Sequence, residues 1–387
     1  MDDARVLVLK PIRRVSPSRY TAMRSCLLRE VWTAAGNLPL LPPSPMAELG
    51  TVIHELLGAA GRGELEGSGH NRVERAWVDL VSLAEKRMAL SALQRHQVPL
   101  SHSIPDYEVR KLRACHRAAE IADATVRGRG GRPKQGLDRT GFEVWVESRD
   151  GHIGGFIDRA SMTPEGVVLS DYKSGAVLVS GKDSDRTVVR RAYKEQLMLY
   201  AALYQMKFGD WPHRLEVVPL QGAPVAVHYN TGEARLLLAG ADTFLHEANR
   251  RITEVENGCR QATDLASPCA ENCMFCLFRP ACRAYWFARR QGPQAYWPAD
   301  VMGLITETTR LRNGKLCIRI VQDQSSKSFC VTVRNLTDDV ERHPLLHQAQ
   351  AGNVVALCGL GHDYRSGDYK ESQNTVLFVI SESRISR

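Results

Sequence analysis

Three polar residues near strand ends carry the clearest chemistry in this sequence. The stretch 143–173 reads EVWVESRDGHIGGFIDRASMTPEGVVLSDYK and places Asp158 at the end of one apolar segment, with Asp171 and Lys173 at the end of the next. Because residues i and i+2 of a strand face the same side, Asp171 and Lys173 are expected to point together. A carboxylate that holds a divalent cation, beside an ammonium that steadies a water molecule or a phosphate oxygen, suits phosphodiester hydrolysis.

These residues also have simpler explanations, which the sequence leaves open. Asp158 precedes Arg159, so a local ion pair is an alternative, and Lys173 could be a surface lysine at a strand end. His54 lies in the apolar helical stretch VIHELL, where a lone histidine is more often a core residue. Beside two carboxylates, a neutral imidazole would form a mixed site that favours Mn²⁺ over Mg²⁺, because magnesium prefers shells made of oxygen alone.

The segments that must position these side chains show strand and helix periodicity. FEVWVES, GHIGGFIDRA and VVLSDYK predict three strands, separated by an Arg-Asp-Gly hairpin turn and a Pro-Glu-Gly turn. A long amphipathic helix is expected over 188–207, where Gln196 and Tyr200 share a face and form either part of a polar site or a polar patch on a core helix. Further predicted elements are a strand over RVLVL, helices over 16–32, 47–60, much of 72–125 and 233–256, and a strand over LEVVPLQ. This order predicts an α/β fold in which a mixed sheet is flanked by helices.

The chain changes character at about residue 299. From there it reads as short strands separated by Asn-Gly and other glycine turns. Five such strands predict a small all-β barrel of the OB-like type, with a β-sandwich or a dimerisation module as the alternatives. We therefore predict two domains, 1–298 and 299–387.

Composition limits the class of protein. With 387 residues and 43% hydrophobic side chains, the chain can bury one large core or two domains. It contains no apolar stretch long enough to span a membrane, and its N-terminal apolar run is too short for a signal peptide. We therefore expect a cytoplasmic protein whose ten cysteines are reduced or metal-bound rather than paired in disulfides.

The excess of positive charge is concentrated in one stretch. The formal net charge is +8, and residues 110–134 hold eight Lys or Arg against two acidic residues. Such a stretch is either a solvated helix face or a surface that attracts a nucleic-acid backbone, and beside a phosphodiesterase-like site the second interpretation is favoured. The candidate contacts in its glycine-rich end are Arg127, Arg129, Arg132 and Lys134.

A cysteine cluster is the second chemical signal. SPCAENCMFCLFRPACRAYW contains Cys269, Cys273, Cys276 and Cys282. Four thiolates suit a [4Fe–4S] cluster or a tetrahedral zinc ion, and spacing alone favours this local set of four. The remaining cysteines show no ligand spacing and are expected to be small buried residues: Cys115, Cys259, Cys317, Cys330 and Cys358.

Six segments in chain order carry a family resemblance: SPSRYTAMRSC, LGTVIHELLG, GGFIDR, SDYKSG, QLMLY and the terminal cysteine cluster. From about residue 15 to 290 the chain resembles the RecB-type branch of the PD-(D/E)XK nuclease superfamily, specifically its iron–sulfur subgroup. That subgroup includes the CRISPR-adaptation exonucleases and the nuclease domains of end-processing helicase–nucleases. The resemblance implies a restriction-endonuclease-like fold for this part of the chain.

The resemblance also implies roles for individual residues. It makes Lys173 the catalytic lysine and places Gln196 and Tyr200 in a helix that supports the site and contacts DNA. It makes Cys26, rather than Cys269, the fourth ligand of the cluster. The implied metal ligands are His54, Asp158 and Asp171, and the implied cluster ligands are Cys26, Cys273, Cys276 and Cys282.

The expected function is that of a metal-dependent DNA nuclease, namely an exonuclease acting on single-stranded or end-processed DNA. The expected cofactors are Mn²⁺ or Mg²⁺ and a structural [4Fe–4S] cluster. No GxxxxGK[ST] loop is present, so any helicase motor would be a separate subunit. The alternatives are an inactive nuclease-fold scaffold that binds DNA, and a zinc-stapled RNA-processing factor.

Overall fold

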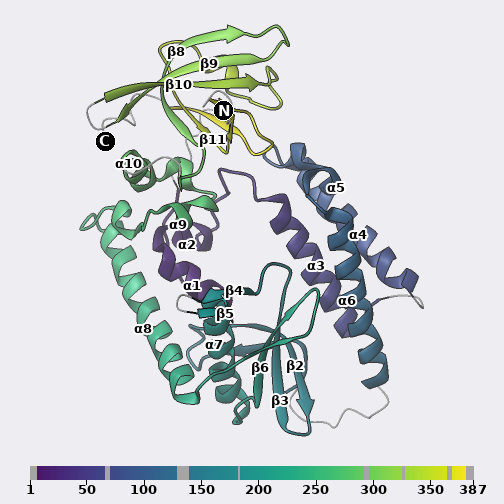
Figure 1. The fold of residues 1–387 in the computed structure, drawn as a ribbon. Helices are drawn as coiled ribbons and strands as arrows, with labels where there is room; N and C mark the ends of the chain where they lie inside the picture. The colour runs from purple at the N-terminus through teal and green to yellow at the C-terminus, as the bar shows by residue number, and fades with distance from the viewer. Residues whose placement is uncertain are drawn as a thin grey trace. The chain divides into compact units, whose positions relative to one another are not determined.

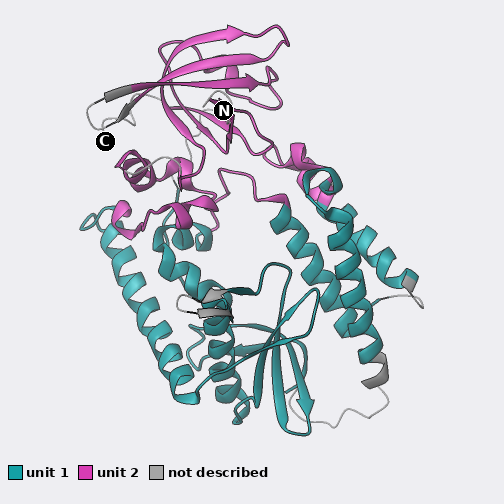
Figure 2. Cartoon of the chain, in the orientation of Figure 1, with its two compact units in different colours: residues 1–35, 46–84, 100–261 teal, residues 36–45, 85–99, 262–387 magenta. Residues whose placement is uncertain are grey.

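A computed structural model describes residues 7–65, 70–128, 139–181, 184–291, 296–324, 327–363 and 368–380. The chain packs into two compact units, which Figure 2 shows in different colours. Unit 1 comprises residues 1–35, 46–84 and 100–261, and unit 2 comprises residues 36–45, 85–99 and 262–387. The predicted domain boundary between residues 298 and 299 was drawn along the sequence, whereas the two units are defined by packing, so the boundary stays a prediction. No helix among the described residues is both long and apolar enough to cross a lipid bilayer.

The centre of unit 1 is a five-stranded mixed sheet with the order β1-β2-β3-β6-β7. Its bounds are β1 (Gly141–Glu147), β2 (Gly154–Thr163), β3 (Gly166–Lys173), β6 (Arg214–Pro219) and β7 (Val225–Val227). The first three strands form an antiparallel meander, β6 runs parallel to β3, and β7 is antiparallel to β6. The three predicted strands and the mixed α/β arrangement are therefore confirmed.

Helix α7 (Arg191–Phe208) lies in the crossover between the parallel strands β3 and β6. It packs against all four larger strands of the sheet and against α1 and α8. Every side chain from Glu195 to Tyr204 is buried, so the helix is present as predicted but its expected amphipathic character is wrong. It ends at Gly209, which adopts a left-handed φ of 90° that glycine accepts at little cost.

Figure 1 shows the sheet of unit 1 with α7 and α8 (Thr231–Glu256) on one side and α3 (Pro45–Arg62) and α6 (Tyr107–Gly128) on the other. Arg62 of α3 forms an ion pair with Glu143 of β1 at 2.6 Å. Arg117 of α6 donates to the backbone oxygen of Pro219, at the end of β6, at 3.1 Å. The helical segments predicted over 47–60, 72–125 and 233–256 correspond to α3, to α4 (His70–Leu90) with α5 (Leu100–Ser103) and α6, and to α8.

Three local expectations differ from the structure. The helix predicted over 16–32 is broken into α1 (Pro17–Ser25) and α2 (Leu27–Ala34), because Cys26 between them is extended, with φ −156° and ψ 102°. Residues 7–9 of the predicted RVLVL strand are not in a strand. The sequence interpretation also missed β7 and the hairpin of β4 (Leu178–Gly181) and β5 (Ser184–Val189).

Unit 2 is built on a seven-stranded sheet with the order β12-β13-β10-β9-β8-β11-β14. Its bounds are β8 (Val301–Arg310), β9 (Leu316–Gln324), β10 (Lys327–Leu336), β11 (Val354–Cys358), β12 (Gly361–His362), β13 (Tyr369–Lys370) and β14 (Val376–Ile380). One apolar cluster, including Val301, Ile320 and Val333, forms its core. Within the described residues the sheet is half of a barrel, and the OB-like closure stays a prediction.

Two buried ionic groups stabilise unit 2. Asp300 is fully buried and accepts hydrogen bonds from Arg279 Nε at 2.6 Å, Tyr285 Oη at 2.8 Å and the Gly359 N–H at 2.7 Å. Arg279 and Tyr285 belong to the segment of α9 (Ala270–Met274) and α10 (Arg283–Gln291). Asp300 directly precedes β8 and Gly359 directly follows β11, so this group connects that segment to two strands of the sheet.

The second group surrounds the carboxylate of Glu371. It accepts from the backbone N–H and the hydroxyl of Thr337, both at 2.7 Å, and from Arg342 Nε at 3.0 Å. Nε2 of His343 lies 3.0 Å from the same carboxylate. These donors, acting against burial, lower the pKa of Glu371 to about 2.

Candidate active site

The acidic pair is set by the pairing of β2 with β3. The antiparallel register joins Arg159 to Ser170, and one further step sets Asp158 opposite Asp171. Residues opposite each other in a sheet point to the same face, so the two carboxylates are neighbours. Asp158 lies in the middle of β2 and not at its end, which corrects the sequence expectation.

Asp171, Lys173 and Gln196 form one hydrogen-bonded group at the end of β3. Lys173 Nζ lies 2.9 Å from Asp171 Oδ1 and 2.7 Å from Oδ2, and it donates to Gln196 Oε1 at 3.3 Å. Gln196 Nε2 in turn donates to Asp171 Oδ1 at 2.7 Å. The expectation that Asp171 and Lys173 share a face is therefore confirmed, and α7 contributes the third member.

The Asp171 carboxylate is buried but incompletely satisfied. Its exposed fraction is 2%, and Oδ2 has no hydrogen-bond partner among the described residues, although it contacts the Lys173 ammonium ionically. Burial raises the pKa of Asp171 to about 6, opposed by Lys173 and assisted by the neighbouring charge of Asp158. A buried carboxylate oxygen that lacks a hydrogen bond, beside a second carboxylate, is suited to a divalent cation.

Asp158 is oriented by the backbone. Its Oδ2 accepts the N–H of Tyr172 at 2.7 Å, which leaves Oδ1 for another partner. Burial raises the pKa of Asp158, while the Tyr172 hydrogen bond and the Lys173 charge act in the opposite direction. The expected alternative of a local ion pair with Arg159 is not what the structure shows, because the Arg159 guanidinium lies over the Phe142 ring at 5.3 Å.

His54 lies on α3, close enough to Lys173 and Asp171 for their charges to act on its pKa. Among the described residues its imidazole does not form, with Asp158 and Asp171, a group of three ligand atoms within 4.8 Å of one another. Its side chain is exposed, so it is not the buried core histidine of the simpler explanation. Desolvation by the surrounding atoms lowers its pKa, Lys173 acts in the same direction, and Asp171 opposes it. Its imidazole is therefore neutral near pH 7, which is the form that ligates metals.

Tyr200 and Gln196 occupy one face of α7 above the acidic pair. Burial, together with the charges of Asp158 and Asp171, raises the pKa of Tyr200, so its hydroxyl stays protonated. A Cβ atom at Gly155 would lie 3.1 Å from that hydroxyl. The Gly-Gly pair that opens β2 is thus a close-approach position, which the sequence signalled only as part of GGFIDR.

Sequence reasoning missed Glu195, which fixes the helix that carries Gln196. This buried carboxylate pairs with Arg191 at 2.7 Å on its own helix and with Arg24 of α1 at 3.4 Å. It also accepts from Thr21 Oγ1 at 3.2 Å. The signal available in the sequence was weak, because Glu195 lies among the polar residues that open this helix, next to Lys194 and Gln196.

The clustered cysteines lie in unit 2, in the segment of α9 and α10. Cys273, Cys276 and Cys282 are buried, and Arg279 donates to the backbone oxygen of Cys276 at 3.1 Å. Cys269 is half-buried and caps α9, because its Sγ accepts the N–H of Asn272 at 3.4 Å.

Cys26 is half-buried at the break between α1 and α2 in unit 1. Of the cysteines expected to be buried without a ligand role, Cys115 and Cys358 are buried as predicted. The expectation is wrong for Cys259 and Cys330, which are exposed, and Cys317 is half-buried. The exposure of these thiols depends on their position in the fold rather than on residue type, since Cys330 lies on the outward side of a strand and Cys259 lies just after a helix.

The predicted nucleic-acid contacts Arg129, Arg132 and Lys134 lie outside the described residues. Arg127 belongs to the last turns of α6. The described basic residues earlier in this helix are partly engaged in structural contacts, as the bonds of Arg117 show.

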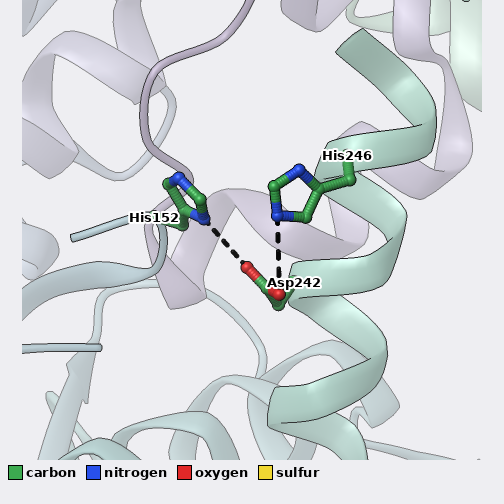
Figure 3. A group of neighbouring side chains, drawn as sticks. All are labelled: His152, Asp242 and His246. Carbon is green, nitrogen blue, oxygen red and sulfur yellow. Dashed lines mark hydrogen bonds and ion pairs between the residues drawn. The ribbon is translucent and has the colours of Figure 1, made fainter. Parts of the chain in front are cut away.

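A second group of potential metal ligands was missed by the sequence interpretation. Among the described residues, one group of three ligand atoms lies within 4.8 Å of one another: those of His152, Asp242 and His246 (Figure 3). A signal was present, because Asp242 and His246 are spaced i, i+4 on a predicted helix. His152, which comes from a distant turn, gave none.

Comparison with known protein families agrees with the mixed α/β fold. The sequence matches the PD-(D/E)XK nuclease superfamily over residues 14–283, which is more than half of the chain. The protein therefore belongs to that superfamily, whose members are typically nucleases, so that a nucleic-acid substrate is implied. No curated protein and no solved structure matches the chain.

Proposed function

We propose that this protein is a metal-dependent DNA nuclease in which His54, Asp158 and Asp171 hold Mn²⁺ or Mg²⁺ and Lys173 acts on the scissile phosphate. The observation that carries the proposal is the buried Asp171 carboxylate beside Asp158, in a chain of this superfamily; its Oδ2 contacts the Lys173 ammonium but has no hydrogen-bond partner among the described residues. The two carboxylates are hard oxygen ligands that suit either ion, and the neutral imidazole favours manganese.

Each residue of the group has a separable task. A bound divalent cation supplies Lewis-acid chemistry, lowering the pKa of water and stabilising charge on phosphate. Gln196 donates to Asp171 Oδ1 and so orients the carboxylate that would hold the ion. Lys173, held between Asp171 and Gln196, directs its ammonium at the phosphate and at the attacking water. The protonated Tyr200 hydroxyl serves as a hydrogen-bond donor to the DNA backbone.

Cleavage of end-labelled DNA tests the proposal. Purified protein is incubated with single- and double-stranded linear DNA, closed circular DNA and matched RNA, each with Mn²⁺ or Mg²⁺. Lys173→Ala is expected to lose cleavage while it retains most DNA binding, because charged surface supplies most of the affinity. The exposed Lys86→Ala is the matched control and is expected to cleave normally.

The substrate comparison separates the alternatives. Cleavage of linear but not circular DNA supports an exonuclease, whereas preferential cleavage of RNA supports the RNA-processing alternative. Binding without cleavage of any substrate supports an inactive scaffold. Wild-type rates for Lys173→Ala would contradict the assignment of catalysis to this site.

The cysteine cluster is proposed to hold a structural [4Fe–4S] cluster through Cys26, Cys273, Cys276 and Cys282. Two observations support this set over the local set of four. Cys269 already has a structural task as the cap of α9, and Cys26 interrupts what would otherwise be one continuous helix. Iron–sulfur clusters are held by thiolates of this kind.

Serine substitutions separate the two ligand sets. Protein purified anaerobically should contain iron and acid-labile sulfide, and Cys26→Ser should remove both. Cys269→Ser should keep them, because serine is itself a preferred helix cap. The exposed Cys259→Ser serves as a control. A colourless protein with one equivalent of zinc would refute the iron–sulfur assignment.

The sheet of unit 2 is proposed to be an OB-like module that binds single-stranded DNA by base stacking. Few of its aromatic residues are available for this: Phe329 is 46% exposed, whereas Tyr369 is buried. Phe329→Ala should weaken single-strand binding about tenfold, a loss in the range of one stacked base. Unchanged affinity would favour protein–protein docking instead.

The basic segment ending in Arg129, Arg132 and Lys134 is proposed to contact DNA phosphates. Replacing these three residues with Gln should weaken binding to all DNA sequences equally and should reduce the salt dependence of binding. Equal affinity and equal salt dependence for this variant would show that the segment is only a solvated surface.

A further inference from the structure

A cluster of two histidines and one aspartate lies in unit 1, on residues to which the proposed nuclease chemistry assigns no role. Nδ1 of His152 lies 3.0 Å from Asp242 Oδ1, and Nε2 of His246 lies 3.7 Å from Asp242 Oδ2. The two imidazole rings are 4.9 Å apart between centroids and nearly perpendicular. Figure 3 shows the two rings side by side, each joined to the Asp242 carboxylate by a dashed line.

The three side chains are held by rigid elements. Asp242 and His246 are one turn apart on α8, whose N-terminus is capped by Asn230. His152 belongs to the turn between β1 and β2, where its own N–H donates to Asp150 Oδ1 at 3.0 Å and its carbonyl accepts from Val15 at 2.8 Å. The ligands are therefore positioned by the backbone before any ion binds.

The segment before α1 closes the site. Asn249, less than one turn beyond His246, accepts the N–H of Ile12 at 2.7 Å and donates to its carbonyl at 3.0 Å. A surface cavity of about 360 Å³ lies between this segment, the β1–β2 turn and α8, and His152 and His246 line it. Solvent or a small anion can therefore reach the cluster.

We propose that His152, Asp242 and His246 form a second metal site that binds a divalent transition ion such as Zn²⁺, with the fourth position open to the cavity. Two imidazoles and a carboxylate with one open position are a zinc ligand set. Tetrahedral bonds of about 2.0–2.1 Å place neighbouring ligand atoms about 3.3 Å apart. His152 Nδ1 lies 3.0 Å from one oxygen of Asp242 and His246 Nε2 lies 3.7 Å from the other, so both nitrogens are already near the carboxylate.

Small side-chain rotations complete the geometry. The His246 side chain is 62% exposed and can turn toward His152 without disturbing packed atoms. The ordinary alternative is an aspartate that bridges two histidines by hydrogen bonds without any ion. Bound zinc would tie the β1–β2 turn to α8, so it should stabilise unit 1 without taking part in phosphodiester cleavage.

Zinc titration of the full-length protein tests the site. Asp171→Asn is introduced into all samples so that the proposed nuclease site contributes little binding, and the protein is stripped with a mild chelator under anaerobic conditions. Calorimetry and metal analysis should find one equivalent of Zn²⁺ that Asp242→Asn and His246→Gln each remove. Zinc should raise the melting temperature of the parent protein but not that of either variant.

The matched control is His116, which forms the same i, i+4 histidine–carboxylate pair with Glu120 at 3.7 Å on α6 but is not one of three clustered ligands. His116→Gln should retain the full zinc stoichiometry. Equal zinc binding and equal thermal shifts in the parent protein and in Asp242→Asn would overturn the proposal. Because cleavage is not measured, failure here leaves the proposed nuclease site unaffected.

Discussion

Two buried aspartates, one in each unit, differ in how completely they are satisfied. Asp300 of unit 2 receives an arginine, a tyrosine hydroxyl and a backbone N–H, whereas Asp171 of unit 1 receives a lysine and a glutamine and keeps Oδ2 without a hydrogen bond. Burial of a carboxylate costs free energy unless donors replace water. Complete replacement gives a structural group, and incomplete replacement leaves a group able to bind something else.

The pKa values of Asp171 and of a third carboxylate, Glu371, show the same contrast. Asp171 is raised to about 6 because burial outweighs its donors, and Glu371 is lowered to about 2 because its donors outweigh burial. The first carboxylate destabilises the ion-free fold near neutral pH, and the second stabilises it. Donor count around a buried acid therefore distinguishes the site from the scaffold in this molecule.

The largest effect is expected at Asp171, where a substitution should reduce activity without reducing stability. Asp171→Asn should reduce cleavage on the order of a thousand-fold, because it removes a charged ligand of the proposed catalytic ion. The melting temperature without metal should not fall, because the neutral amide avoids burying a charge. Parallel cleavage assays and thermal melts measure the two properties, and a strongly destabilised variant would contradict the contrast with Asp300.

At Asp300 the opposite pattern is expected. Asp300→Asn leaves the buried Arg279 without its counter-charge, which should lower the free energy of unfolding by about 3–5 kcal/mol. Denaturant titration measures this loss. The cleavage rate per folded molecule should stay near that of the parent protein, and a loss of catalysis with normal stability would reverse the assignment.

Glu371 should give a smaller effect that depends on pH. Its pKa falls from 4.5 to about 2 on folding, so its contribution of about 3 kcal/mol is fully present above pH 4.5 and is lost as the pH falls toward 2. Unfolding free energies of the parent protein and of Glu371→Gln should therefore differ at pH 5–7 and converge toward pH 2. A difference independent of pH would show that packing, not ionisation, is responsible.

An exposed acid should give the smallest effect. Glu147 pairs with Arg14 at 2.9 Å, but both side chains are about 40% exposed. Glu147→Gln should change the free energy of unfolding by less than about 1 kcal/mol, and added salt should reduce even that. A loss as large as that of Asp300→Asn would show that burial is not what separates these carboxylates.

The acidic pair could be predicted from sequence because it depends on short-range geometry. Strand alternation fixes Asp171 and Lys173 on one face, and the turn before β3 fixes the strand order. The helix carrying Gln196 could also be predicted, from its length and apolar content. The burial of the entire middle of α7 could not be predicted, because the residue pattern of one helix does not show how many other elements pack against it.

Other features depend on pairs far apart in the chain, which periodicity cannot supply. The ion pair of Asp300 with Arg279 and the contact of His152 with Asp242 form only when elements that are distant in the sequence pack together. The break at Cys26 is likewise invisible in an otherwise helical pattern, since the flanking residues favour helix on both sides. The sequence placed Asp158 at the end of a strand because the apolar run ends there, but β2 continues to Thr163.

The meander of β1, β2 and β3 makes the acidic pair more sensitive to the length of its segment than to its composition. Exchange of one apolar residue for another in β3, such as Val168→Ile, keeps the alternation and therefore keeps both carboxylates on one face. Deletion of one residue between Gly166 and Asp171 shifts the period by one and turns Asp171 and Lys173 to the opposite face. Evolution of this chain can therefore exchange the apolar residues of β3 for one another, while insertions and deletions are confined to the turns on either side.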